Sequence, residues 1–559
     1  MTYTVSSTDY SKSLFDRLAS VRHIEDDMED FLNPSFEKYR NNPSELADID
    51  KAVDRIMKAM KNDEKIMIFG DYDVDGIISS YVLYTFFRKY AGYHQISIQL
   101  PHRKNDGYGI KDYHVTKIKE MGCGLIITVD NGITAIQEAE VAKEIWIDMI
   151  ITDHHHALDE IPDAFAVINP QVSKKSSFKE VCWATVAWKL ALQLAKKLEL
   201  DEATHQAYLD EMLPFVAIAT VADCMPLVKE NRLIVKKWLE LMNHHRSKLA
   251  TSLQGFLHYL NIQKVDTYHI GFMIAPRLNA TGRVWSAHDG LACLLTNDIA
   301  KQKKLLQHVD ELNDQRKETQ QEMIDKADTF TDPQKMIITA ADESFHAGIV
   351  GIVAGRLTEK YYKPSVILEI NKEKWIATGS LRWPEYFSVL KMLKDAEELL
   401  ERYGWHEQAW GLTVDIKNLD AMFARFDTYC KKTIWDTPPP KILKVDTGLM
   451  QEEMSPNLID ELELFGPYGI GNEKPNFLIE WVCVSKIDII GKKERKHLKL
   501  HCSKGDISFH CMRRGKGDES ETISLNTPLN LIWSIKRDDR NGGWYVDTML
   551  CEQKEEIIA

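Results

Sequence analysis

The sequence has 559 residues, which is enough for three or four domains and several hydrophobic cores. Hydrophobic residues make up 44% and charged residues 28%, as is ordinary for a soluble globular protein. The net charge of −14 excludes a histone-like protein that binds nucleic acid through bulk positive charge, although a local basic groove remains compatible with it.

Cysteine usage and hydropathy indicate the compartment. The nine cysteines include no C-x-x-C pair, which argues against a disulfide framework and a thiolate zinc site and favours a reducing compartment. No run approaches 18 apolar residues, and the first residues lack the basic and apolar segments of a secretion signal. We therefore expect a soluble cytoplasmic protein without a membrane partner.

The first part of the chain alternates strands and helices. Residues 10–63 have a polar pattern typical of helices, and a short apolar strand begins at Lys65. Further strands, separated by helices, are predicted within residues 95–101, 123–132, 146–156 and 165–170. This alternation predicts an α/β fold with a mostly parallel sheet.

Polar residues follow three of these strands at the point where each strand ends. Asp71, Asp73 and Asp75 follow the first strand, Asp130 follows a later one, and residues 153–156 (DHHH) follow the next. In open α/β sheets, ligands bind outside the carboxyl ends of the strands. We therefore predict that the three segments converge on one crevice.

The second part of the chain changes pattern twice. Residues 183–290 are mainly helical in pattern, and residues 298–329 fit one long amphipathic helix. A second α/β unit follows, and the alternating strands after the prolines at 438–440 predict a small β-barrel of the OB type. The predicted domains are an N-terminal helical segment (1–60), a catalytic domain (61–295), a connecting helix (296–332), a smaller α/β domain (333–436) and the barrel (437–559).

The predicted crevice would hold mostly carboxylates and one or two imidazoles, including Asp223 from the loop VADCMPL. Like charges at close range raise one another's pKa, and one or two divalent cations resolve that conflict. Carboxylates with some imidazole suit Mn²⁺ or Mg²⁺ better than zinc, and two such ions assist phosphoester or phosphoanhydride hydrolysis. DYDVDG or TVDNG alone is also compatible with an ordinary turn, but their occurrence together with DHHH at strand ends favours the metal site.

These motifs resemble a known family. GDYDVDGIISS, TVDNGIT, TDHH and VADCMPL, in that order, resemble the motifs of the DHH phosphoesterase family, and most closely those of its RecJ single-strand-specific exonucleases. Downstream, PRLNATGR, LNDQR, FHAGIVGIVAGRL, GSLRW and FGPYGIGNEKPNF resemble the rest of the RecJ core and the entry to its OB domain. The resemblance implies a DHH domain, a DHH-associated domain and a C-terminal OB fold.

The resemblance also implies roles for individual residues. It gives two divalent cations, Mn²⁺ or Mg²⁺, the ligands Asp73, Asp75, Asp130, His154 and Asp223, with Asp130 bridging the ions. His155 would face the scissile phosphate, and the expected catalytic residues are His155, Asp130 and Arg277. Asp71 and Asp153 would orient the ligands.

Phosphate and nucleic-acid contacts are expected from a further set. Arg is the favoured donor to phosphate, and Arg103, Ser380 and Arg382 resemble a pocket for a terminal 5′ phosphate. The other expected contacts, for which a solvated or packed side chain is the alternative, are Tyr108, Arg277, Asn279, Arg283, His346 and His406. Basic segments at 491–499 and 513–517 would form a groove on the barrel, or serve only as solubilising turns.

The sequence departs from the family pattern at several positions. Phe69 occupies a position where many DHH proteins have a histidine ligand. Near His406, Trp405 and Trp410 replace a glycine and a small residue, so that they would narrow the strand channel, stack bases or fill the core. These departures bear on the length of strand that the channel would accept.

The function implied by the resemblance is a 5′ to 3′ exonuclease that releases 5′-mononucleotides from single-stranded DNA in repair, recombination or replication. A monomer is expected, with a helicase or single-strand-binding protein as candidate partners. One alternative is a DHH phosphodiesterase for short oligonucleotides or cyclic dinucleotides, against which the long helix and the barrel argue. The other is a non-catalytic replication scaffold, against which the complete set of five ligands argues.

Overall fold

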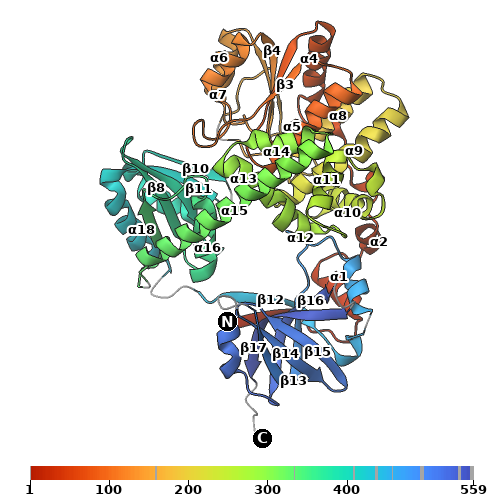
Figure 1. Ribbon diagram of the computed structural model, residues 1–559, viewed down its shortest axis with the longest axis vertical. Helices are drawn as coiled ribbons and strands as arrows, with labels where there is room; N and C mark the ends of the chain where they lie inside the picture. Colours follow the sequence, from red (N-terminus) through yellow and green to blue (C-terminus); the bar gives the residue numbers. More distant parts are fainter. Residues whose placement is uncertain are drawn as a thin grey trace. The chain divides into compact units, whose positions relative to one another are not determined.

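The structure, a computed structural model, describes residues 2–157, 160–332, 334–406, 409–434, 439–455, 457–491, 496–538 and 543–553. The chain forms two compact units (Figure 1). One unit joins Met1–Tyr39 to Pro440–Ala559, and the other contains Arg40–Pro439. Among the described residues, no helix is long and apolar enough to span a membrane.

The larger unit contains the predicted parallel sheet. Its strands are β2 (Lys65–Phe69), β3 (Ile96–Gln99), β4 (Cys123–Val129), β5 (Asp148–Thr152) and β6 (Ala166–Ile168). They are all parallel, in the order β3-β2-β4-β5-β6. After β3 the chain crosses back to the other side of β2, so that the switch point of the sheet lies between β2 and β4. The apolar runs of the strands are buried because helices cover both faces.

Helices surround this sheet and extend the unit (Figure 1). Beside the sheet lie α4 (Ile49–Lys61), α5 (Val74–Thr85), α6 (Asp112–Glu120) and α7 (Ile136–Glu144). The helical region that follows comprises α8 (Trp183–Lys197), α9 (Glu202–Ala222), α10 (Lys229–His244), α11 (Thr251–Tyr259), α12 (Thr267–His269), the π-helical turn η4 (Ile270–Ile274), α13 (Ala275–Val284) and α14 (Ala287–Leu295). The predicted long helix is confirmed as α15 (Ile299–Phe330), and it packs along α13.

A second sheet completes the larger unit. Its order is β10-β11-β9-β8-β7, and only β7 and β8 are parallel. The strands are β7 (Ile338–Asp342), β8 (Ser365–Asn371), β9 (Ile376–Arg382), β10 (Arg402–His406) and β11 (Ala409–Asp415), and the helices are α16 (Val350–Tyr361), α17 (Val389–Asp395) and α18 (Leu419–Ile434). β9 and β10 were not predicted, because their sequences IATGSLR and RYGWH carry no continuous apolar pattern.

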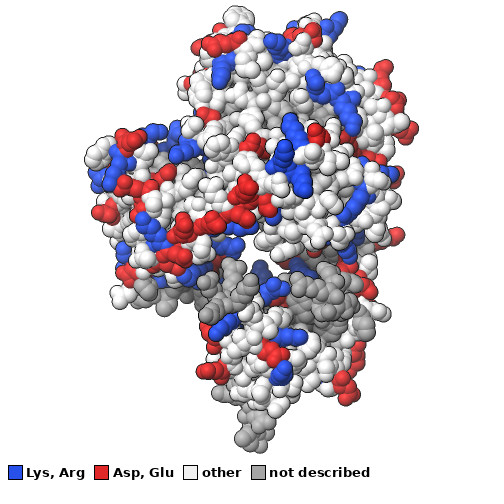
Figure 2. Space-filling model, viewed as in Figure 1, with Lys and Arg blue, Asp and Glu red and all other residues white. Residues whose placement is uncertain are grey.

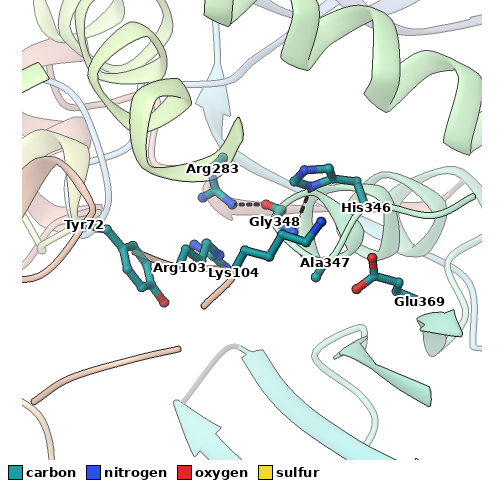
Figure 3. A pocket seen from close by; sticks show the side chains of 8 residues that line it. All are labelled: Tyr72, Arg103, Lys104, Arg283, His346, Ala347, Gly348 and Glu369. Atoms are coloured by element: carbon teal, nitrogen blue, oxygen red, sulfur yellow. Dashed lines mark hydrogen bonds between the residues drawn. The ribbon is translucent and has the colours of Figure 1, made fainter. Parts of the chain in front are cut away.

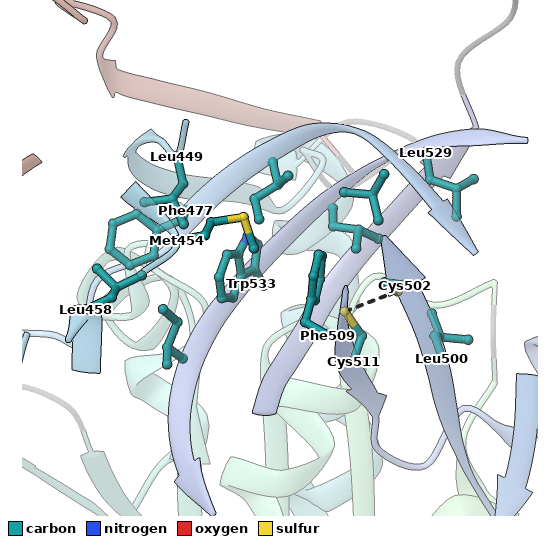
Figure 4. Packing of buried hydrophobic residues seen from close by; sticks show 14 of the residues in the cluster. Leu449, Met454, Leu458, Phe477, Leu500, Cys502, Phe509, Cys511, Leu529 and Trp533 are labelled. Carbon is teal, nitrogen blue, oxygen red and sulfur yellow. Dashed lines mark hydrogen bonds between the residues drawn. The ribbon is translucent and has the colours of Figure 1, made fainter. Parts of the chain in front are cut away.

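The smaller unit is built around a closed β-barrel, which confirms the predicted OB-type fold. β13 pairs with β14 and also with β16, so the order β13-β14-β15-β17-β16 closes on itself. Its strands are β12 (Ile442–Gly448), β13 (Phe477–Ile490), β14 (His497–Lys504), β15 (Ile507–Arg513), β16 (Pro528–Asp538) and β17 (Gly543–Gln553), with α19 (Leu458–Leu464) beside them. Trp533 is fully buried in the barrel core and stacks on Phe509 (Figure 4).

The first 39 residues fold with this barrel. They form β1 (Thr2–Ser7), α1 (Leu14–Val21), α2 (Met28–Leu32) and α3 (Phe36–Tyr39). β1 pairs in parallel with β12, and the buried Arg17 donates to Thr447 and to both oxygens of Glu453. The sequence predicted helical material here and no strand, because the partner of β1 lies at the other end of the chain. The predicted domain limits remain a proposal.

Candidate metal and nucleic-acid site

Five carboxylates converge at the switch point of the parallel sheet. Asp71, Asp73 and Asp75 follow β2, Asp130 follows the neighbouring β4, and Asp223 ends α9. We name these five residues the carboxylate cluster. His154 and His155, which follow β5, lie against it. Ligand atoms lie within 4.8 Å of one another in three groups, namely Asp71–Asp73–Asp130, Asp75–His154–Asp223 and Asp130–His154–His155.

The backbone holds the cluster in place. Asp130 has φ of 64°, a left-handed conformation that costs a non-glycine residue about 1 kcal/mol or more. Asp73 caps α5 by accepting from the Gly76 N–H at 3.0 Å. Both Asp75 oxygens accept from the first amides of α8, those of Trp183 and Ala184, at 2.6 and 2.8 Å. The start of α8 therefore fixes Asp75.

The two histidines are oriented by different partners. His154 Nδ1 donates to the Val181 carbonyl at 2.9 Å, and its Nε2 lies 3.6 Å from Asp130 and 3.7 Å from Asp223. This geometry directs Nε2 toward the carboxylates, as in many metal-binding histidines. His155 Nδ1 lies 2.7 Å from Asp153, which in turn accepts from the Ile133 N–H at 2.8 Å.

The carboxylates of the cluster repel one another, and too few neighbouring cations offset their charge. Burial, together with the neighbouring carboxylates, raises the pKa of Asp71, Asp130 and Asp223, and raises the pKa of Asp75 to about 7. Asp71 Oδ1 and Asp223 Oδ2 are buried without a hydrogen-bond partner. Carboxylate oxygens with imidazole nitrogen are the donors that Mn²⁺ and Mg²⁺ accept, so the residues present fit divalent cations.

The Asp153–His155 pair behaves in the opposite way. Burial alone would raise the pKa of Asp153, but the charge and the hydrogen bond of His155 lower it below its ordinary value. Burial opposes a charged imidazole, but Asp153 outweighs it and raises the pKa of His155 to about 9. Asp153 therefore favours the charged form of His155 beside the cluster.

A positively charged pocket adjoins the cluster (Figure 3). Its volume is 160 Å³, and we name it the cationic pocket; it is lined by Tyr72, Arg103, Lys104, Arg283, His346, Ala347, Gly348 and Glu369. Tyr72 stands between Asp71 and Asp73, so the pocket and the cluster share one loop. The Arg103 guanidinium lies 4.7 Å from the Tyr72 ring centre.

Among the described residues, no carboxylate forms an ion pair with Arg103, Lys104 or Arg283, although Glu369 also lines the pocket. Burial, and then Arg103, lowers the pKa of Arg283 to about 9 and that of Arg382 to about 10. Arg283 donates to the Gly348 carbonyl at 3.1 Å, and a Cβ on Gly348 would lie 2.3 Å from the Arg283 carbonyl oxygen. Only a glycine allows α13 and the loop before α16 to approach this closely. The pocket therefore fits a phosphate group.

The comparisons with known proteins agree with this geometry. The DHH family N-terminal domain matches residues 65–220, and the RecJ OB domain matches residues 445–552. The single-stranded-DNA-specific exonuclease RecJ of Bacillus subtilis (strain 168) is 33% identical over 506 residues, which cover 89% of this chain and 62% of that protein. The protein of the same name from Salmonella typhimurium is 30% identical over 456 residues, covering 78% of each. This chain belongs to the RecJ family.

The fold of this RecJ family member is also similar to a solved structure. RecJ from Thermus thermophilus, crystallised in complex with Mn²⁺, has a TM-score of 0.81 at 23% identity, covering 99% of this chain and 79% of that one. The resemblance predicted from the motifs is thus confirmed. The chain nevertheless spans less than two thirds of the length of its Bacillus relative.

Within this RecJ fold, several predicted contacts lie near the cationic pocket or the cluster. Arg103, Arg283 and His346 line the pocket, whereas Ser380 and Arg382 lie on β9, where Arg382 donates to Ser380. Asn279 accepts from the Val74 N–H at 3.2 Å. The Tyr108 hydroxyl donates to the Asp130 carbonyl at 3.0 Å, with its ring partly exposed.

Other predicted residues lie elsewhere. Arg277 pairs with Asp310 of α15 at 2.8 Å and donates to the Met273 carbonyl, so its guanidinium is held by helices and does not line the pocket. Trp410 is packed in the core of the second sheet, stacked on Tyr403. The side chains of Trp405 and His406, and residues 492–495 of the predicted basic groove, lie outside the part that the structure describes.

Three structural features add to the sequence reasoning. Tyr72, Lys104 and Glu369 line the pocket without having been predicted to do so; Tyr72 lies in DYDVDG and Lys104 next to Arg103, whereas Glu369 carried no sequence signal. Trp183 is fully buried and stacks on His154 at 5.5 Å, which accounts for the bulky CWATVAW segment. Phe69, at the position of a family histidine, is buried and contacts the ring of His114.

Proposed function

We propose that this chain is a metal-dependent exonuclease that degrades single-stranded DNA from its 5′ end and releases 5′-mononucleotides. One observation carries this proposal: the cluster that fits divalent cations and the pocket that fits phosphate share the loop of Asp71, Tyr72 and Asp73. The names of the Bacillus and Salmonella relatives support the reaction and the substrate.

The ligands would be Asp73, Asp75, Asp130, His154 and Asp223, with Asp130 between two ions of Mn²⁺ or Mg²⁺. Asp130 belongs to two of the three groups of converging ligand atoms, which supports the bridging role. When bound, the ions activate a water molecule and neutralise charge on the phosphate oxygens. The Mn²⁺ complex of the Thermus RecJ supports this choice of metal. Asp71 would orient neighbouring ligands from beside the loop.

The protein's own residues would complete the reaction. His155 would stabilise the scissile phosphate or protonate the departing 3′ oxygen, while Asp153 orients its ring and favours its charged form. The water oxygen bonds to phosphorus, the bond from phosphorus to the 3′ oxygen breaks, and the released nucleotide keeps its 5′ phosphate. Arg277 would act through α13, since Asp310 holds its side chain.

The cationic pocket would set the polarity. Arg103 and Arg283 would bind the terminal 5′ phosphate, with Ser380, Arg382 and His346 beside it, so that the scissile bond lies next to the cluster. Acidic side chains gather over α15 in Figure 2. The exposed acidic residues of this helix include Glu311, Asp314, Glu318, Glu322 and Asp325. A strand would thus be attracted to the pocket and not to this surface.

The barrel would add a second contact with the strand. OB folds bind single strands through the strands that correspond here to β14 and β15, and the exposed Arg514 and Lys516 follow β15. A cytoplasmic location, a monomeric state and helicase or single-strand-binding partners remain part of this proposal.

The test is degradation of single-stranded DNA with Mn²⁺, compared with duplex DNA and with a metal chelator. We expect progressive loss of the single strand, a resistant duplex and no reaction in chelator. Cleavage of di- to pentanucleotides alone would favour a small-substrate phosphodiesterase, and Mn²⁺ binding without any cleavage would contradict the proposal.

A further inference from the structure

Two exposed aromatic rings are stacked on each other at the start of the helical run that leads to the site. Tyr268 and Phe272 are 59% and 66% exposed. Their ring centres are 4.9 Å apart, with an angle of 24° between the planes, so the rings are stacked on each other in solvent. Single exposed aromatic residues are common, but in this stacked pair both rings keep accessible surface on which a further flat group can stack.

The backbone holds this pair firmly. Tyr268 lies in α12, whose first turn is capped because Asp266 accepts from the His269 N–H at 2.9 Å. Phe272 lies in the π-helical turn η4, where Ile270 and Ile274 are buried on the opposite side. Such π-helical turns are frequent at functional sites. The two rings are therefore presented by a fixed element and not by a loop.

The same helical face continues to the proposed site. After Tyr268 and Phe272, the next residues with exposed surface at helical spacing are Pro276, Asn279 and Arg283. Asn279 contacts the loop of the carboxylate cluster through the Val74 N–H, and Arg283 lines the cationic pocket. At 1.5 Å per residue, the rise from Phe272 to Asn279 is about 10 Å.

The order along this face matches the order along a bound strand. Arg283 adjoins the proposed position of the terminal phosphate, Asn279 adjoins the cluster, and the aromatic pair follows beyond it. On the basis of the proposed function, we propose that Tyr268 and Phe272 stack against bases of the single strand on the 3′ side of the scissile bond. Aromatic stacking suits a nuclease without sequence preference, because every base has a flat face.

The proposal is tested by placing one abasic residue at successive positions in a 5′-phosphorylated single strand. With the wild-type protein, we expect KM to rise when the abasic residue reaches the position that meets the pair. In the double variant Tyr268→Ala/Phe272→Ala, we expect KM for the intact strand to rise about 5- to 100-fold, and the position effect to disappear. Cleavage of a phosphorylated dinucleotide, which does not reach the pair, should be unchanged.

Matched variants separate stacking from other roles. Tyr268→Phe keeps the ring and should behave as wild type, and Trp146→Ala removes a ring that is 88% exposed on the same unit but away from this helix. A double variant that keeps wild-type KM and the wild-type abasic pattern would overturn the inference, as would an altered oligomeric state with unchanged KM. Failure of the wild-type protein to cleave any strand would instead contradict the proposed function.

Discussion

The carboxylate cluster and the cationic pocket share the loop that holds Tyr72, yet the pKa values of their charged groups shift in opposite directions. In the cluster, burial and mutual repulsion raise carboxyl pKa values, to about 7 for Asp75. In the pocket, burial and a neighbouring guanidinium lower the pKa of Arg283 to about 9. Each region therefore disfavours its own charge until a ligand of the opposite charge binds.

The Asp153–His155 pair shows how buried groups behave when each has a partner of opposite charge within the protein. There a buried carboxylate and an imidazole satisfy each other, and both are stabilised in the charged form. The cluster holds more carboxylates than neighbouring cations, and the pocket holds Arg103, Lys104 and Arg283 against the single carboxylate of Glu369, so each region fits a partner of opposite charge from outside the chain. A phosphate chain with divalent cations supplies both at once, because the cations fit the cluster and the terminal phosphate fits the pocket.

The largest expected effect comes from the cluster. Asp130→Asn removes the carboxylate shared by two ligand groups, and we expect kcat on single-stranded DNA with Mn²⁺ to fall by about 10³-fold or more. Asp325→Asn, on the exposed face of α15, should leave kcat unchanged. Full activity of the Asp130 variant would show that the cluster does not perform the chemistry.

The pocket should affect binding and not chemistry. Arg283→Ala removes a charged donor, so KM for a 5′-phosphorylated strand should rise about 10- to 100-fold, while a strand with a 5′ hydroxyl should be affected much less. Arg425→Ala, an exposed arginine of α18, serves as the control. Equal losses on both strands would mean that the pocket does not bind the terminal phosphate.

The cluster should also make stability depend on pH in metal-free protein. A carboxyl group whose pKa is raised on folding stabilises the fold below its ordinary value of 3.8 and loses that contribution as pH rises through its folded value, about 7 for Asp75. The Tm in chelator should therefore fall across this range, and Mn²⁺ should reverse the fall. The dependence should be shallower in Asp130→Asn, and a pH-independent Tm in this range would contradict the charge assignment.

The smallest expected effect concerns the loop that carries Arg103. Asp106 accepts from the His102 N–H and from the Tyr113 hydroxyl, both at 2.7 Å, and so closes the loop around Arg103. Tyr113→Phe removes one hydrogen bond and should raise KM for phosphorylated strands about two- to tenfold, with kcat unchanged. Tyr403→Phe, which loses a similar bond to Glu397, should have no effect on KM.

The sequence was informative where structure depends on neighbours along the chain. Apolar strands followed at once by Asp71, Asp130 or Asp153 predicted both the parallel sheet and the crevice, because parallel strands end at one edge. Long-range pairing was not predictable in the same way. β1 pairs with β12, which lies near the other end of the sequence, and Arg277 forms an ion pair with Asp310 of a different helix. Neither partner is close in the sequence.

Pocket lining was the least predictable feature. Glu369 and Tyr72 reach the pocket because two α/β domains meet there; Glu369 lies outside every motif, and Tyr72 lies in DYDVDG, whose carboxylates and not its tyrosine carried the prediction. Trp410 illustrates the converse, since it departs from the family pattern near His406 but simply fills the core of the second sheet. A motif thus predicts the reaction type of a site better than it predicts which residues from other elements line that site.

The most direct test of the account follows the first product from a long single strand labelled at either its 5′ or its 3′ end, with Mn²⁺ present. The account predicts that the 5′ label appears at once as a mononucleotide, while the 3′ label stays in a shortening strand until late in the reaction. Early release of the 3′ label, or a first labelled product longer than one nucleotide, would contradict the placement of the terminal phosphate beside the carboxylate cluster.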